Sequence, residues 1–103
     1  MCIFCKILDG EIPSNPVYED ENCIVIPDLH PQAPVHYLVI PRQHISSISA
    51  VQDSEWVIIT HLLQVAQNIG QNFPGYKLQF NVNSAGGQEI MHIHLHLLAG
   101  FAE

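Results

Sequence analysis

The stretch from His92 to Leu98 constrains the fold more than any other part of the sequence, because histidines alternate in it with Ile and Leu. Successive side chains of a β-strand point to opposite faces, so the three histidines would share one face and the apolar residues the other. The pattern predicts a strand over residues 90–98 that packs on one side and presents a row of imidazoles on the other. Three polar rings on one face indicate a shared chemical purpose.

The spacing of the three histidines argues against a single metal site. Each strand residue rises about 3.3 Å, which puts the Cα atoms of His92 and His96 about 13 Å apart. Metal–nitrogen bonds are about 2 Å long, so two neighbouring rings could share a metal but three could not converge on one. A row of imidazoles is better suited to following an extended anion. Gly86 and Gly87, just before the row, would let backbone N–H groups approach such an anion closely.

Hydrophobic spacing and turn residues predict the remaining elements. Residues 54–71 are expected to form the one long helix, with Asp53 as its N-cap. Residues 2–9 would form a short helix that ends at Gly10. Further strands are expected at residues 17–20, 23–27, 36–41 and 76–82. The long helix has an apolar stripe suited to core or dimer packing, made of Ile58, Leu62, Val65, Ala66 and Ile69.

These elements define the fold class as α+β. It consists of a five-stranded antiparallel sheet with one long helix and a short N-terminal helix, because the connections between neighbouring strands are mostly short. The whole chain, residues 1–103, is expected to be a single domain.

The charge balance limits the classes of partner. Three Lys and Arg stand against ten Asp and Glu, which gives a formal charge of −7 at pH 7. Such a chain lacks the basic surface of proteins that bind long nucleic acids, whereas backbone N–H groups and histidines can still hold one nucleotide. No apolar run reaches the ~18 residues of a membrane span, and the first residues do not form a signal peptide. We therefore expect a cytoplasmic protein that binds neither a membrane nor a nucleic acid polymer.

Cys2 and Cys5 form a Cys-x-x-Cys pair. In a cytoplasmic protein this spacing indicates metal binding or redox chemistry rather than a structural disulfide. No thioredoxin-like βαβ pattern surrounds the pair, which disfavours a redox role. The simplest alternative is a pair of half-buried helix cysteines. The third cysteine, Cys23, lies in a predicted strand and is expected to be part of the core.

The sequence resembles the histidine triad (HIT) family. Residues His92–Leu98 fit the family signature, in which three histidines alternate with apolar residues and two apolar residues follow. The similarity extends over nearly the whole chain and points to the nucleotide-binding branch, the purine nucleoside phosphoramidase-like proteins. It is carried by residues 3–7, 11–13, 28–36, 39–45 and 81–88.

The resemblance implies a homodimer of α+β protomers that binds a purine mononucleotide, AMP or GMP. Such proteins hydrolyse nucleoside 5′-phosphoramidates and related aminoacyl adenylates and release AMP, with no cofactor required for catalysis. His94 would attack the α-phosphorus and form a covalent nucleotidyl-histidine intermediate, which water then hydrolyses. The carbonyl of His92 would accept the other ring N–H of His94, and His36 would support the triad from the adjacent strand. His96 would hold phosphate oxygens.

The resemblance also implies contacts to the nucleotide. Asp28 matches a carboxylate that binds the ribose hydroxyls, and Asn81 matches a polar residue near the phosphate. The backbone N–H groups of the loop formed by Gly87, Gln88 and Glu89 would help to hold the phosphate. An apolar purine pocket would be formed by Ile3, Phe4, Ile7, Ile26, Leu29 and Leu38.

A structural zinc site is implied by the same resemblance. Some bacterial members combine the cysteine pair with a histidine at the place of His44 and with the first triad histidine, here His92. Two thiolates and two imidazoles make a closed tetrahedral zinc site. Members without the cysteines exist, so the metal would lie outside the chemistry.

Two departures from the family pattern leave the substrate open. Glu89 stands where many members have Ser or Thr, so the role of that hydroxyl does not carry over; Glu89 would either turn away from the phosphate or donate a proton. The segment after the triad is also shorter than in related proteins. One alternative is therefore a non-catalytic nucleotide sensor with the same pocket. A metal-dependent enzyme with a His-x-His pair and a pure interaction module are further alternatives.

Overall fold

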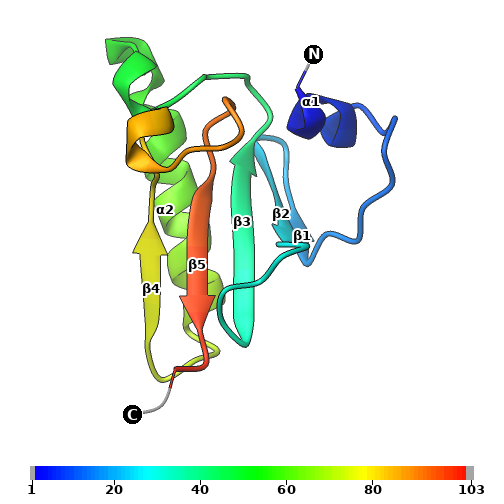
Figure 1. Cartoon of the computed structure of the whole chain (residues 1–103), viewed down its shortest axis with the longest axis vertical. Helices are drawn as coiled ribbons and strands as arrows, with labels where there is room; N and C mark the ends of the chain where they lie inside the picture. The colour runs from blue at the N-terminus through cyan, green and yellow to red at the C-terminus, as the bar shows by residue number, and fades with distance from the viewer. Residues whose placement is uncertain (1, 102–103) are drawn as a thin grey trace.

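A five-stranded antiparallel sheet forms the centre of the computed structural model, which describes residues 2–101 (Figure 1). The strands lie in the order β1-β2-β3-β5-β4. This confirms the expected α+β class. The strands are β1 (Tyr18–Glu19), β2 (Cys23–Pro27), β3 (Val35–Pro41), β4 (Tyr76–Gln79) and β5 (Leu95–Ala99). Among the described residues, no helix is long and apolar enough to cross a membrane.

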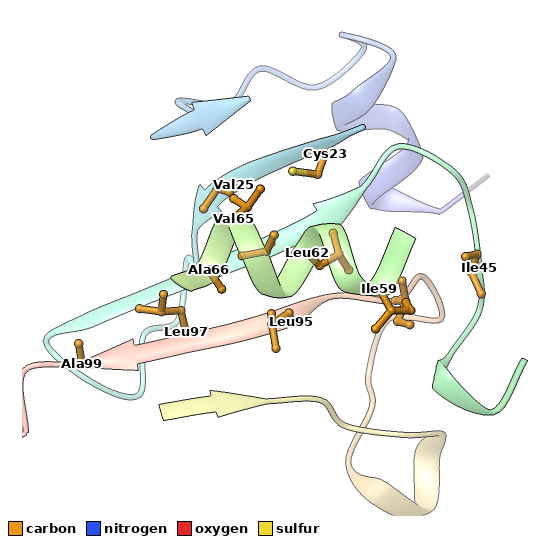
Figure 2. Packing of buried hydrophobic residues seen from close by; sticks show 12 residues of the cluster. Cys23, Val25, Ile45, Ile59, Leu62, Val65, Ala66, Leu95, Leu97 and Ala99 are labelled. Atoms are coloured by element: carbon orange, nitrogen blue, oxygen red, sulfur yellow. The ribbon is translucent and has the colours of Figure 1, made fainter. Parts of the chain in front are cut away.

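The two helices pack on opposite faces of the sheet. α2 (Trp56–Gly70) covers one face, where its buried side chains meet those of β2, β3 and β5 (Figure 2). α1 (Ile3–Leu8) lies on the other face and contributes Phe4 to a second cluster. The main cluster contains Val25, Val39, Leu62, Val65, Ala66, Leu95 and Leu97, and the second contains Ile24, Ile26, Leu38 and Ile40. Alternate residues of β2 and β3 therefore divide between two cores, as the period of a strand requires.

The start of the long helix differs from the expectation. A 3₁₀ turn, Asp53–Glu55, precedes α2, and Asp53 is not the capping residue. Gln52 forms a capping box with Glu55 instead, in which the backbone N–H of Gln52 donates to Glu55 Oε1 over 2.8 Å. The box satisfies two end-of-helix N–H groups reciprocally, which a single Asp cap does not. In the expected stripe Ile58 and Ile69 are only partly buried, whereas Ile59, which was not expected in the stripe, is buried.

The histidine segment enters the sheet later than expected. β5 begins at Leu95 rather than at residue 90, and β4 ends at Gln79 rather than at residue 82. Before Leu95 the chain is held by other bonds, such as that from the Ile93 N–H to the Ile45 carbonyl at 2.7 Å. Alternation nevertheless persists, since Ile93, Leu95 and Leu97 all enter the main core. The histidines between them are left for the opposite face.

Candidate active site

Three side chains on neighbouring strands line up across the sheet and form the floor of the site. Leu38 of β3 is the register partner of His96 of β5, and His96 is in turn the partner of Gln79 of β4. Directly paired residues of antiparallel strands project from the same face. The row runs from an apolar to a polar side chain with an imidazole at its centre.

His94 is held in one orientation by the backbone. Its Nδ1 donates a hydrogen bond to the carbonyl oxygen of His92 over 2.8 Å. A carbonyl can only accept, so the proton of the neutral ring is on Nδ1 and the lone pair is on Nε2. The rings of Phe4 and His96 flank His94 at centroid distances of 5.1 and 4.9 Å. Burial lowers the pKa of His94 below its ordinary value, and its bond to the His92 carbonyl opposes this only in part. The result is a neutral imidazole with a nucleophilic nitrogen.

His96 is oriented by His36 through a chain of hydrogen bonds. The Gln32 backbone N–H donates to His36 Nδ1 over 3.1 Å, so the proton of His36 must be on Nε2. That N–H points to His96 Nδ1 at 2.9 Å, which leaves the His96 proton on Nε2. Burial, followed by the charges of His94 and His36, lowers the pKa of His96 to about 4. His96 is thus a neutral donor, suited to a phosphate oxygen.

The rings of His94 and His96 line a cavity of about 490 Å³. Eight of its lining residues were singled out from the sequence: Phe4, Asp28, Leu38, Asn81, Gly87, Glu89, His94 and His96. Four more were not: His30, Gln32, Gln79 and Ile90. Of these four, Gln79 could have been found by extending the strand register from His96, whereas nothing local marks the others.

Several residues that the resemblance assigned to the nucleotide pocket lie outside the cavity lining. Ile3 is 47% exposed on α1 and Leu29 is 87% exposed in the loop before β3. Ile26 belongs to the second core cluster, and Ile7 packs against that cluster. These side chains support the wall of the cavity or stand beside it, and their contact with a base stays a prediction.

The glycine loop is a turn closed by its own backbone hydrogen bonds. Gly87 has a φ of +87°, and a Cβ on it would lie 3.2 Å from Asn81 Nδ2. The buried Gln88 side chain accepts from the Asn83 N–H and donates to the carbonyls of Ser46 and Ile90. The N–H groups of Gly87 and Gln88 already donate to carbonyls of the same loop, at 3.0 Å each. Gln88 therefore acts as a positioning residue, and phosphate binding by either amide would require the loop to change its bonding.

A second cluster of ligand atoms lies beside the triad. The Sγ atoms of Cys2 and Cys5 and the Nδ1 atoms of His44 and His92 lie within 4.8 Å of one another. The four sulfur–nitrogen distances are 3.3 to 3.6 Å, and the two nitrogens are 3.1 Å apart. Tetrahedral zinc with bonds of about 2.3 Å to sulfur and 2.0 Å to nitrogen would place such atoms about 3.3 to 3.6 Å apart. The residues therefore fit a closed zinc site.

His92 connects this cluster to the triad. Its Nε2 donates to the Pro41 carbonyl over 2.8 Å, so the lone pair of the neutral ring is on Nδ1, the atom that faces the cysteines. Its own carbonyl accepts from His94. The side chain thus belongs to the metal cluster and the main chain to the candidate catalytic site.

The amino-acid sequence matches a known protein family over almost its whole length. The family model described as "Scavenger mRNA decapping enzyme C-term binding" matches residues 1–102. A HIT-like protein of Chlamydia trachomatis is 40% identical over 101 residues, which cover 95% of this chain and 91% of that protein.

Solved structures give the same result. A HIT family hydrolase from Legionella pneumophila is 47% identical with a TM-score of 0.94, over 99% of this chain and 95% of that one. A zinc-bound histidine triad family protein from Mycobacterium smegmatis is 31% identical with a TM-score of 0.85, over 97% of this chain and 75% of that one.

Proposed function

The chain belongs to the HIT family, and from that premise we propose that it is a purine nucleotide-binding hydrolase that cleaves nucleoside 5′-phosphoramidates or related adenylates and releases AMP. The observation that carries the proposal is the bond from His94 Nδ1 to the His92 carbonyl, which fixes a lone pair on Nε2 of a ring that lines the cavity. That arrangement suits a nucleophile better than a ligand or a core residue.

The reaction proceeds in two displacements. His94 Nε2 attacks the α-phosphorus, the P–N bond breaks, and the amine leaves with the bonding electron pair and takes up a proton from solvent. Water then attacks the same phosphorus and gives a proton to solvent, the P–Nε2 bond breaks with its electron pair returning to Nε2, AMP is released and the neutral imidazole is restored. His96, with its proton on Nε2, donates to a phosphate oxygen in both steps, and such preorganised donors typically contribute a few kcal/mol.

The nucleotide lies with its base toward the apolar part of the lining. Phe4, Leu38 and Ile90 supply that part, and Asp28 lies at the ribose. One Asp28 oxygen accepts from the His30 N–H at 2.8 Å and the other lies 3.5 Å from His36 Nε2. The carboxylate is therefore held in place before the sugar arrives.

Zinc has a structural role in this proposal. Cys2, Cys5, His44 and His92 would hold it, and the bound metal would fix α1 to the histidine segment. Phe4, carried by α1, contacts the rings of both His92 and His94. The chain's own residues carry out the reaction, with no cofactor required.

We also propose that two copies associate, in the cytoplasm, through the edge of the sheet. β4 is the last strand in the sheet order, and Tyr76 and Leu78 on it are each 37% exposed. Unpaired edge strands offer N–H and C=O groups to a second strand. Leu63, exposed on α2, adds apolar surface.

The decisive experiment measures AMP release from adenosine 5′-phosphoramidate in the presence of a chelator, for wild type and His94→Ala. We expect turnover in the wild type and its loss in the variant, with AMP binding measured in parallel by calorimetry. A wild type that binds AMP without turnover would contradict the hydrolase and favour the sensor, for which Glu89 in the lining is the motivating feature.

A further inference from the structure

We propose that Glu89 selects the leaving group, favouring substrates in which the group displaced from the α-phosphorus carries a positive charge. The inference rests on the proposed function, because it takes the α-phosphorus to lie over His94. It goes further by assigning a specificity role to a residue at which this chain departs from the family pattern.

The cavity is polarised across the sheet. Leu38, His96 and Gln79 succeed one another from β3 to β5 to β4. Phe4 and Leu38 belong to the second core cluster and Ile90 packs against it, so apolar lining gathers on the β3 side. Gln79 and Asn81 give the β4 side a polar lining. A nucleotide whose base takes the apolar side and whose phosphorus lies at the histidines must direct its leaving group toward the β4 side.

Glu89 lines the same cavity two residues after Gly87, in the loop that Asn81 of the β4 side contacts through the Gly86 carbonyl. Its neighbour Gln88 is buried and bonded to Asn83, Ser46 and Ile90, which pins the loop and leaves Glu89 exposed in the lining. Among residues 2–101, Glu89 has no hydrogen-bond or ion-pair partner on its side chain. The other carboxylate of the lining, Asp28, accepts from the His30 N–H, and its second oxygen lies 3.5 Å from His36 Nε2. Within the described residues, Glu89 is therefore the carboxylate of the lining whose negative charge is left free to meet a ligand.

No Lys or Arg opposes that charge. The chain has three, and none lines the cavity. Arg42 donates to the Asp20 carbonyl and lies near Glu19, Lys77 lies 5.8 Å over the Phe101 ring, and Lys6 is in the last turn of α1. A leaving group that is itself a phosphate would meet a carboxylate and no cation, whereas an ammonium group would be attracted.

The test uses three AMP phosphoramidates of similar size that differ in the charge of the amine: N-(2-aminoethyl), N-propyl and N-carboxymethyl. The ratio of kcat/KM for the cationic over the anionic compound is measured at pH 8 in wild type and in Glu89→Gln. Glu21→Gln removes the same charge from the exposed turn between β1 and β2 and is the matched control. Because intrinsic reactivity of the compounds is common to all three proteins, only the change in the ratio is interpreted.

We expect the ratio to fall about three- to tenfold in Glu89→Gln and to stay at the wild-type value in Glu21→Gln, which is the size expected for a charge pair near the surface. Raising the salt from 0.05 to 0.5 M should lower the ratio in wild type and leave Glu89→Gln unaffected. A ratio that Glu89→Gln does not change at low salt overturns the inference.

Failure of the proposed function gives a different result. If wild type binds AMP but cleaves none of the three compounds, hydrolysis is wrong, and the same ratio is then taken from dissociation constants by calorimetry. A cationic preference in binding that is lost in Glu89→Gln supports the role of Glu89 in that case. Equal binding ratios in wild type and variant overturn it.

Discussion

His36 Nε2 lies 2.9 Å from His96 Nδ1, and this contact decides which nitrogen of His96 faces the cavity with a proton. The direction of these hydrogen bonds is fixed by the backbone N–H of Gln32. This group can only donate, so His36 Nδ1 must accept from it. Two histidines on neighbouring strands thus act as a unit: in the proposed function His96 contacts the substrate phosphate and His36 positions His96.

Removal of the N–H donor at residue 36 should disorder the His96 tautomer. We expect His36→Ala to lower kcat/KM by about tenfold or more, or ~1.4 kcal/mol of transition-state stabilisation. His36→Gln, which keeps an N–H near the position of Nε2, should retain more activity. The ¹⁵N shifts of His96 should report a single Nε2-protonated tautomer in wild type and a mixture in His36→Ala.

His61→Ala is the control for the His36 variants. His61 lies on α2 and bonds to Asp20 at 2.7 Å, away from the cavity lining. Activity should be unaffected in this variant. Equal tautomer populations in His36→Ala and wild type would show that His36 only fills space.

The depressed pKa of His96 makes the fold sensitive to acid. With a folded pKa of about 4, caused first by burial, against about 6.5 in the unfolded chain, the unfolded state binds more protons between these values. This contribution to stability is complete above pH 6.5 and declines as the pH falls toward 4. After allowance for solvent screening, we expect this contribution to the free energy of unfolding to be about 1–2 kcal/mol.

Urea unfolding at pH 7.5 and pH 4.5 measures this contribution. His96→Gln, which cannot titrate, should lose less stability between the two values than wild type does. If wild type and His96→Gln lose equal free energy of unfolding between the two pH values, other groups cause the acid sensitivity.

Metal removal should loosen α1 while leaving His94, the proposed nucleophile, in place. We expect about one zinc per chain by elemental analysis and almost none in Cys2→Ser, because a structural site requires all of its ligands. Metal-free protein should unfold at a lower temperature and bind AMP more weakly, since Phe4 loses its anchor. Cys23→Ala, at a buried cysteine outside the cluster, should keep its zinc. Retention of full zinc content by Cys2→Ser would contradict the four-ligand site.

The edge strand predicts the oligomeric state. We expect wild type to sediment as a dimer and Leu78→Asp to sediment as a monomer, because the charge is placed in an exposed apolar position of β4. Lys77 is the neighbouring residue, and its side chain points to the other face of β4. Lys77→Asp therefore tests whether dimerisation depends on the face of β4 that carries the new charge. A monomeric wild type would rule out the interface.

The sequence predicted the elements whose patterns are local and could not predict those that depend on distant partners. β2 was expected with the bounds that it has, because its apolar run lies between clear turn residues. The start of β5 was misplaced, because the bond from Ile93 to the Ile45 carbonyl joins segments far apart in the chain. His44 meets the cysteines only through the fold, and it was placed with them by resemblance rather than by spacing. Gln32 acts through its backbone N–H, for which no side-chain pattern exists.

The main chain of His92 accepts the hydrogen bond from His94, whereas its side chain belongs to the metal cluster. Any amino acid except one that disturbs the backbone offers the same carbonyl to His94. The imidazole at that position is consequently not needed for the hydrogen bond that orients the ring of His94. In the proposed function, substitutions at residues 2, 5, 44 and 92 would therefore remove the metal site and still leave the backbone bond to the proposed nucleophile in place.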